Sequence, residues 1–110
     1  MSAETFIAYF GLRFEVGPEE VEGVEGRTDR RVVAARRIGL KCYWGSFGEL
    51  QDSYLLFIGA ELGKLGAENS ESVNIPLNAL QRLIDITKAK LVEAGFEGVP
   101  SLHLQWEPDI

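Results

Sequence analysis

A cluster of basic side chains is the first group of residues in this chain that could do chemistry. Residues 27–41 hold six of the eleven lysines and arginines but a single acid. The centre of the cluster is Arg30, Arg31, Arg36 and Arg37. Such a cluster can bind nucleic acid, hold a small anionic ligand, or pair with nearby acids. The net charge of −6 disfavours nucleic acid, and four glutamates lie just before the cluster in residues 17–26. Pairing with that acidic segment is therefore the interpretation we favour.

Aromatic side chains and one further arginine form a second candidate group. Tyr9 and Arg13 belong to one expected strand, Tyr43 and Trp44 to another, and Tyr54 to a third. Tyrosine and tryptophan rings stack on small ligands and bases, and they are enriched at protein interfaces. We expect these five side chains to form a ligand site or an interface on the open face of a sheet.

Groups that would indicate catalysis, a metal or a cofactor are sparse. His103 is the only histidine, and its place on an alternating strand predicts a solvated side chain. Cys42 is the only cysteine, so an internal disulfide is excluded and a buried structural thiol is predicted. The glutamates of residues 17–26 lack the ligand spacing of a calcium loop. We therefore expect no catalytic residue, metal or cofactor, and the sequence leaves open whether the protein is an enzyme.

The glycines of residues 59–65 do not form a phosphate-binding loop. That motif needs four residues between its glycines and a serine or threonine after the lysine. Here three residues separate Gly59 from Gly63, and Leu65 follows Lys64. Nucleotide binding through this segment is not expected.

Length and composition predict one globular domain, residues 1–110. The share of apolar residues, 45%, is ordinary for a globular protein, and a chain of this length can bury one core without staples. The longest apolar run, residues 54–60, is far shorter than the roughly 20 residues that span a bilayer. Since the first residues have no basic region ahead of an apolar stretch, we expect a cytoplasmic protein.

Two helices are expected to position the candidate groups. Residues 76–96 repeat apolar side chains at helical spacing and end at Gly95, which can adopt a left-handed conformation. Residues 27–39 predict a shorter helix, with Thr28 as its N-cap and Gly39 as its stop.

The strands come from runs with a period of two and from apolar runs bounded by turn residues. They are expected at residues 5–16, 41–47, 53–59 and 101–107, with a further short extended piece at residues 72–75. The order predicts an α+β protein with an antiparallel sheet and two helices on one face. It matches the ferredoxin-like βαββ(β)αβ arrangement, with the last strand at an edge beside the first.

The faces of this expected sheet lead to a hypothesis about function. In the first strand Phe6 and Leu12 take the helix-covered side, so Ile7 and Tyr9 must point the other way. A second side with large apolar groups usually marks an interface. We therefore expect a non-enzymatic protein-interaction or regulatory module that forms a homodimer through the face away from the helices. Two alternatives remain: cover of that face by residues 61–75, and a small-ligand site or small enzyme on it.

Overall fold

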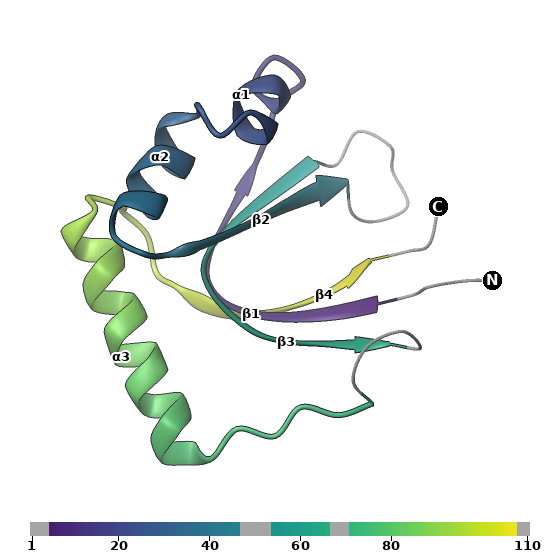
Figure 1. The fold of residues 1–110 in the computed structure, drawn as a ribbon, viewed down its shortest axis with the longest axis vertical. Coiled ribbons are helices and arrows are strands. Elements are labelled where there is room, and N and C mark those ends of the chain that lie inside the picture. Colours follow the sequence, from purple (N-terminus) through teal and green to yellow (C-terminus); the bar gives the residue numbers. More distant parts are fainter. Residues whose placement is uncertain (1–4, 47–53, 67–70, 108–110) are drawn as a thin grey trace.

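The computed structural model describes residues 5–46, 54–66 and 71–107. These residues build a sheet with helices packed against it (Figure 1). The elements are β1 (Thr5–Glu15), α1 (Val21–Glu25), α2 (Arg30–Arg37), β2 (Lys41–Ser46), β3 (Tyr54–Gly66), α3 (Leu77–Glu93) and β4 (Ser101–Glu107). The protein is thus α+β, with two helical units: α1 and α2, which follow each other across a bend, and α3.

The four strands form one antiparallel sheet in the order β2-β3-β1-β4. The alternating pattern of β1 explains its central place, because apolar side chains on both of its faces need cover. β4 lies at one edge beside β1, as the sequence predicts. The other edge strand, β2, pairs only with β3.

β3 is longer than the sequence predicts. Residues 60–66, which lie beyond the strand expected at residues 53–59, continue the strand and pair with β1 as far as Thr5↔Gly66. The register shifts between Ala8↔Gly63 and Tyr9↔Glu61, so Leu62 forms a bulge that absorbs the irregularity. Pairing along the whole of β1 here outweighs a local composition that is poor for strands.

The expected extra strand at residues 72–75 is wrong, since these residues adopt no strand in the structure. They pass over β3 instead: a Cβ added to Gly63 would overlap a methyl group of Val73. The absent side chain of Gly63 therefore gives this segment its room. Residues 47–53, which include the end of the strand expected at residues 41–47 and the start of the one expected at 53–59, lie outside the described residues.

The helix ends follow local chemistry. Asp29, not Thr28, is the N-cap of α2, and its carboxylate accepts a hydrogen bond of 2.8 Å from the backbone N–H of Arg31. Gly39, with φ +83°, ends that helix in the left-handed conformation the sequence predicts. Gly95, with φ +86°, does the same for α3, and the N–H of Phe96 then donates to the carbonyl of Leu91.

A pair of glycines bends the two central strands at the same point. Gly11 and Gly59 face each other in the register, with φ of +155° and +157°. A Cβ on Gly11 would overlap the carbonyl oxygen of Ile58, and one on Gly59 would overlap that of Phe10. Only glycine permits this approach of two backbones. Figure 1 shows β1 and β3 curving sharply through their middle, so that the sheet curls.

The bend divides the sheet into two halves. One, which we call the covered half, contains β2, residues 54–59 of β3 and the end of β1. The other, the uncovered half, contains residues 60–66 of β3, the start of β1, and β4, which pairs with β1 over residues 5–11. Each half thus has an edge strand of its own.

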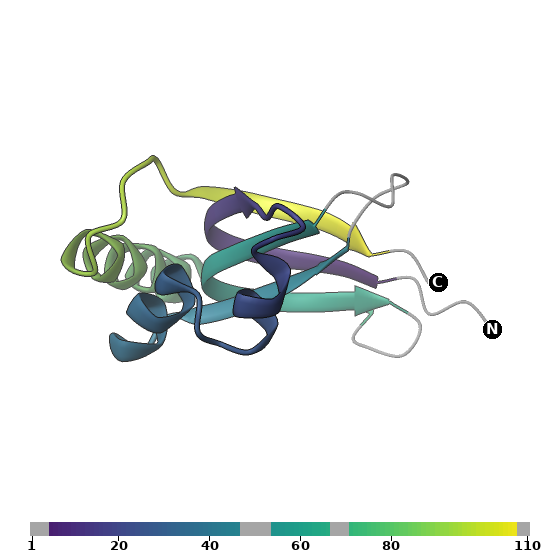
Figure 2. The same ribbon diagram turned by 90° about the horizontal axis from the view of Figure 1, so that it is seen from above.

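The main core lies between the covered half and the helices. Leu12, Val16, Leu56 and Ile58 are buried in one cluster with residues of all three helices: Val24, Val32, Ala35 and Leu91. α1, α2 and the last turns of α3 therefore cover one side of this half, and Figure 2 shows these helices gathered toward one end of the strands. We call this side of the sheet the helix side.

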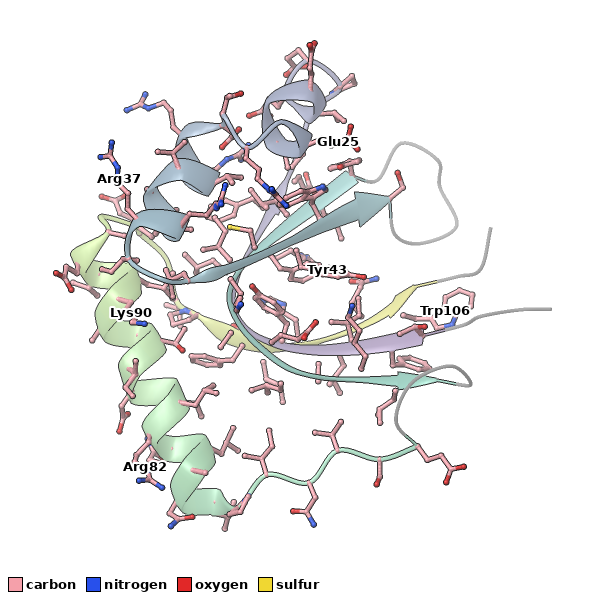
Figure 3. The ribbon with its side chains drawn as sticks, viewed as in Figure 1. Glu25, Arg37, Tyr43, Arg82, Lys90 and Trp106 are labelled. Atoms are coloured by element: carbon pink, nitrogen blue, oxygen red, sulfur yellow. The ribbon has the colours of Figure 1, made fainter. Side chains whose placement is uncertain are left out.

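A second, smaller core fills the opposite side of the sheet. Ile7, Tyr9 and Phe57 are buried there, with Tyr43 and Leu55 packed against them. The curl of the sheet brings Tyr43 of β2 into the space beneath it, as Figure 3 shows. The apolar face that the sequence analysis expects to be an open interface is therefore closed within a single chain.

Candidate functional site

A groove of about 760 Å³ lies between α3 and the edge of β3. β2 pairs with β3 only as far as Gly59, so within the described residues no strand flanks Ala60 and Glu61 on that side. α3 runs alongside this stretch and forms the other wall. The side chains that line the groove include those of Tyr9, Leu40, Lys41, Cys42, Tyr43, Glu61, Arg82, Leu83, Ile86, Thr87 and Lys90.

The helical wall of the groove follows from spacing in α3. Ala79, Leu83, Ile86 and Lys90 recur at intervals of three or four residues and so share one face. Arg82 lies beside them on the same wall, and Figure 3 shows Arg82 and Lys90 following each other along the helix. This face is rotated away from Thr87 and Leu91, the two residues of α3 that are buried.

Three cations surround the groove and have no acidic partner in it. None of Lys41, Arg82 and Lys90 forms an ion pair with another described residue. Among the described residues, Glu61 is the single acid of the lining, and its Oε1 lies 3.8 Å from Nζ of Lys64. The turn after α2 lies close to Lys90, since a Cβ on Gly39 would lie 3.4 Å from Nζ of Lys90. This closeness helps to bring the basic side chains of β2 and α3 to one site. The groove is therefore a local positive site in a chain of net charge −6.

Two tyrosines give the groove an aromatic wall. The hydroxyl of Tyr9 donates a hydrogen bond to the backbone carbonyl of Lys41, which ties β1 to the start of β2 across β3. Burial raises the pKa of the Tyr9 phenol well above its ordinary value, so it stays neutral and acts as an anchor. Nζ of Lys64 lies 4.9 Å from the centre of the Tyr43 ring, a cation–π contact.

The other three residues of the aromatic group lie away from this groove. Arg13 is exposed on the side of the second core, opposite Phe57 in the register. Trp44 is half-buried against the main core. The hydroxyl of Tyr54 donates to the carboxylate of Glu25 at 3.0 Å, and burial together with this contact raises its pKa to about 12. Of the five predicted residues, the structure brings Tyr9 and Tyr43 together.

The basic cluster divides in a similar way. Arg31 binds Glu20 at 3.0 Å and Asp29 at 2.9 Å, and its guanidinium lies 5.4 Å from the Phe14 ring centre. This is the pairing with the acidic segment that the sequence favours. The guanidinium also holds the pKa of the Asp29 carboxyl below its usual value.

The remaining members of the cluster, Arg30, Arg36 and Arg37, are exposed. A smaller cavity of about 360 Å³ lies between Arg27, Arg36 and Trp44, and Lys41 belongs to it and to the groove. The positive charge therefore continues from α2 toward α3, and Figure 3 shows Arg37 on the same side of the molecule as Lys90 and Arg82.

His103 differs from the expectation of a solvated side chain. It is half-buried: Nε2 lies 3.0 Å from the carbonyl oxygen of Gly11, and its ring meets the Phe57 ring edge-on at 5.4 Å. Cys42 is half-buried, and burial raises the pKa of its thiol, which disfavours the nucleophilic thiolate. Among the described residues, no group of three histidine, cysteine or carboxylate side chains could hold a metal ion.

Three apolar side chains on the helix side of the uncovered half are largely exposed to solvent. Phe6 is 51% exposed, Leu102 59% and Leu104 72%. Strand alternation and register put all three on the helix side, because Phe10 and Ala8 pair with Leu102 and Leu104. We call these three residues the β4 surface. Figure 3 shows Trp106, at the far end of β4, well away from α3.

The cations of α3 are not among the predicted site residues. Arg82 and Lys90 lie off the apolar stripe of residues 76–96, where solvated charges are normal. The one available signal is Ile86, an apolar residue off the main stripe and four positions from each of them. An apolar residue flanked in this way on a helix surface indicates a second contact face.

Among the described residues, no helix is both long and apolar enough to cross a membrane. Comparisons with protein-family models, with curated proteins and with solved structures find no match to this chain. Any function must therefore be argued from the two surfaces just described, the groove and the β4 surface.

Proposed function

We propose that this protein is a self-associating interaction module, in which two copies dock through β4 and the β4 surface. The observation that carries the proposal is the exposure of Leu102 and Leu104 on an edge strand. Burying large aliphatic side chains stabilises an association by roughly 1.5–3 kcal/mol for each one fully removed from water.

The edge itself supports docking of another strand. β4 pairs with β1 on one side, and no described strand lies on its other side. Natural edge strands are commonly blunted by lysine, proline or inward charges. Residues 101–106, SLHLQW, contain no proline and no lysine, arginine, aspartate or glutamate. The strand is thus open to hydrogen bonding along its backbone.

A second copy of the chain is the occupant that fits this edge. Two β4 strands related by a twofold axis run antiparallel, and each brings its leucines to those of the other. Each copy has a net charge of −6, so two copies repel except where a surface is uncharged. Residues 101–106 provide such a surface. Because Ile7, Tyr9 and Phe57 are already buried, this interface replaces the one expected on the face away from the helices.

We also propose that the arrangement is ferredoxin-like. Its support is the antiparallel order β2-β3-β1-β4, with β1 and β3 in the centre, and the placement of residues from α2 and α3 in one core on the helix side. An experimentally determined structure with a different strand order would remove this part of the proposal.

Sedimentation equilibrium tests the proposed self-association. We expect the wild type to reach twice the mass of one chain, 12.2 kDa, as its concentration rises. The variant Leu102→Lys/Leu104→Lys should remain at 12.2 kDa, because it places charge on the edge strand.

The matched control is Val92→Lys/Val99→Lys, which adds the same charge at two exposed apolar residues off β4. It should associate like the wild type. A wild type that stays at the mass of one chain at millimolar concentration, or equal loss of association in both variants, would contradict the proposal.

A further inference from the structure

We propose that the groove between α3 and β3 binds an amphipathic organic anion: an apolar body with one carboxylate, phosphate or sulfonate group. The inference stands on observations separate from self-association. The groove borders the free edge of β3, whereas β4 forms the opposite edge of the sheet.

The size of the groove suits a small molecule. Its volume of about 760 Å³ falls within the range of roughly 300–1,000 Å³ that ligand pockets commonly have. Its walls come from four elements, β1, β2, β3 and α3, which are separate in the chain and fix the shape of the site. A body of several carbon atoms can therefore lie between the helix and the strand edge.

The charges of the groove select an anion. Lys41, Arg82 and Lys90 line it from two elements and make no ion pair with the described residues. Glu61, the one acid that the described residues contribute to the lining, already has Lys64 nearby. Unneutralised cations brought together by a fold repel one another and attract an anionic group. An anionic group would therefore be attracted to the groove.

The apolar lining of the groove favours a ligand with an apolar body. Leu40 is buried at the floor, and Leu83 and Ile86 project from α3. Ile86 is 55% exposed although it faces a lining with aliphatic and aromatic neighbours. A ligand body lying on Ile86 and Leu83 would remove this apolar surface from water.

The groove favours a small anion over a polynucleotide. Three cations cannot track an extended backbone, and the net charge of −6 repels a polyanion at long range. Tyr43, the ring best placed to stack on a base, already carries Lys64 over one face. Nucleic acid binding is therefore an alternative result of the experiment below.

Decanoate, used below its micelle concentration, is a suitable probe, with 1-decanol as its uncharged counterpart. We expect decanoate to bind in a saturable way and to shift the backbone amide NMR signals of Lys41, Ala60, Glu61 and Ile86. Its affinity should fall with added salt and exceed that of 1-decanol by about tenfold, the size expected for a few partly exposed charge contacts.

Two variants locate the binding site. Arg82→Gln/Lys90→Gln should weaken decanoate by about tenfold and leave 1-decanol unchanged. Ile86→Ser should weaken both ligands, since it removes apolar contact only. The matched control Arg13→Gln/Lys88→Gln removes two exposed cations outside the groove and should bind decanoate like the wild type. Unchanged melting temperatures confirm that each variant is folded.

Several results would overturn the inference. These are equal affinity for decanoate and 1-decanol, equal weakening by the two charge variants, and signal shifts confined to β4. A single-stranded oligonucleotide that binds the same residues more tightly than decanoate would replace the small anion with nucleic acid.

Discussion

The covered and uncovered halves of the sheet carry the same kinds of side chain on the same face, but these side chains are buried in one half and exposed in the other. On the helix side of the covered half, Leu56 and Ile58 are fully buried and Leu12 nearly so. On the helix side of the uncovered half, Phe6, Leu102 and Leu104 are more than half exposed. The two sets lie on either side of the glycine bend at Gly11 and Gly59.

The difference arises from where the helices lie and not from the strands. α1, α2 and the last turns of α3 pack beyond the bend, while only Thr87 and Leu91 of α3 are buried. The early turns of α3 border the groove instead. An apolar stripe on a strand therefore predicts which side chains are stabilised by burial. The tertiary arrangement determines whether other parts of the chain bury them. The following experiments compare the two halves, from the largest expected effect to the smallest.

Shortening a leucine in each half gives the largest contrast. Leu56→Ala should lower the free energy of unfolding by about 2–5 kcal/mol, because it leaves a cavity in the main core. Leu104→Ala should lower it by less than about 1 kcal/mol in dilute protein, where the residue is largely in water. Urea melts measure both. Similar losses would show that the uncovered half is packed after all.

Adding a methyl group at the bend should also cost stability. Gly59→Ala places a Cβ against the carbonyl of Phe10 at a positive φ, and we expect a loss of about 1–3 kcal/mol. Gly23→Ala in α1 is the control, because its Cβ would meet only ordinary contacts of 3.6 Å and more, and alanine favours helix. Equal stability of Gly59→Ala and the wild type would mean that the bend does not need glycine.

Because of the Asp29–Arg31 pair, we expect the free energy of unfolding to depend slightly on pH in the acidic range. Arg31 lowers the pKa of Asp29 in the folded protein, so the pair stabilises above the unfolded pKa of Asp29 and is lost as the pH falls through the folded value. Asp29→Asn should reduce the difference in unfolding free energy between pH 7 and strongly acidic pH by roughly 0–1 kcal/mol, the size of a partly exposed pair. An unchanged pH profile would contradict this role.

Tyr54 predicts the smallest effect, at alkaline pH. Its pKa rises to about 12 in the folded protein because of burial and the contact with Glu25, whereas an unfolded tyrosine titrates near 10. Because the pKa is raised, the contribution of Tyr54 to the free energy of unfolding is fully present below pH ~10 and is lost as the pH rises toward 12. Tyr54→Phe should flatten this fall in chemical melts. A slope equal to that of the wild type would assign the fall to other groups.

The periodic elements of this fold can be predicted from the sequence. The alternation of β1 and β4 and the apolar repeat of α3 each follow from a local pattern, and Gly39 and Gly95 mark helix ends by their need for positive φ. The place of β4 beside β1 follows from the order of these elements. The closeness of the acidic segment to the arginines in the chain also predicts that the two pair, as Arg31 and Glu20 do.

What the sequence does not reveal depends on contacts between distant segments. The extension of β3 requires β1 as a template, and its glycines and its lysine suggest a turn when read alone. Ile84, one of the apolar side chains in the repeat of residues 76–96, is only half-buried, because α3 turns Thr87 and Leu91 to the sheet and its earlier turns to the groove. The groove itself combines residues of β1, β2, β3 and α3, so no single stretch of sequence contains its pattern.

Amide hydrogen exchange along the two edge strands tests most directly whether the uncovered half is a docking surface for a second copy. We predict that the β4 amides directed away from β1 become more protected as protein concentration rises, while the outer amides of β2 do not change. Edge amides gain protection only when a partner strand hydrogen-bonds to them. Exchange in β4 that stays fast and independent of concentration, at a mass of 12.2 kDa throughout, would contradict the account.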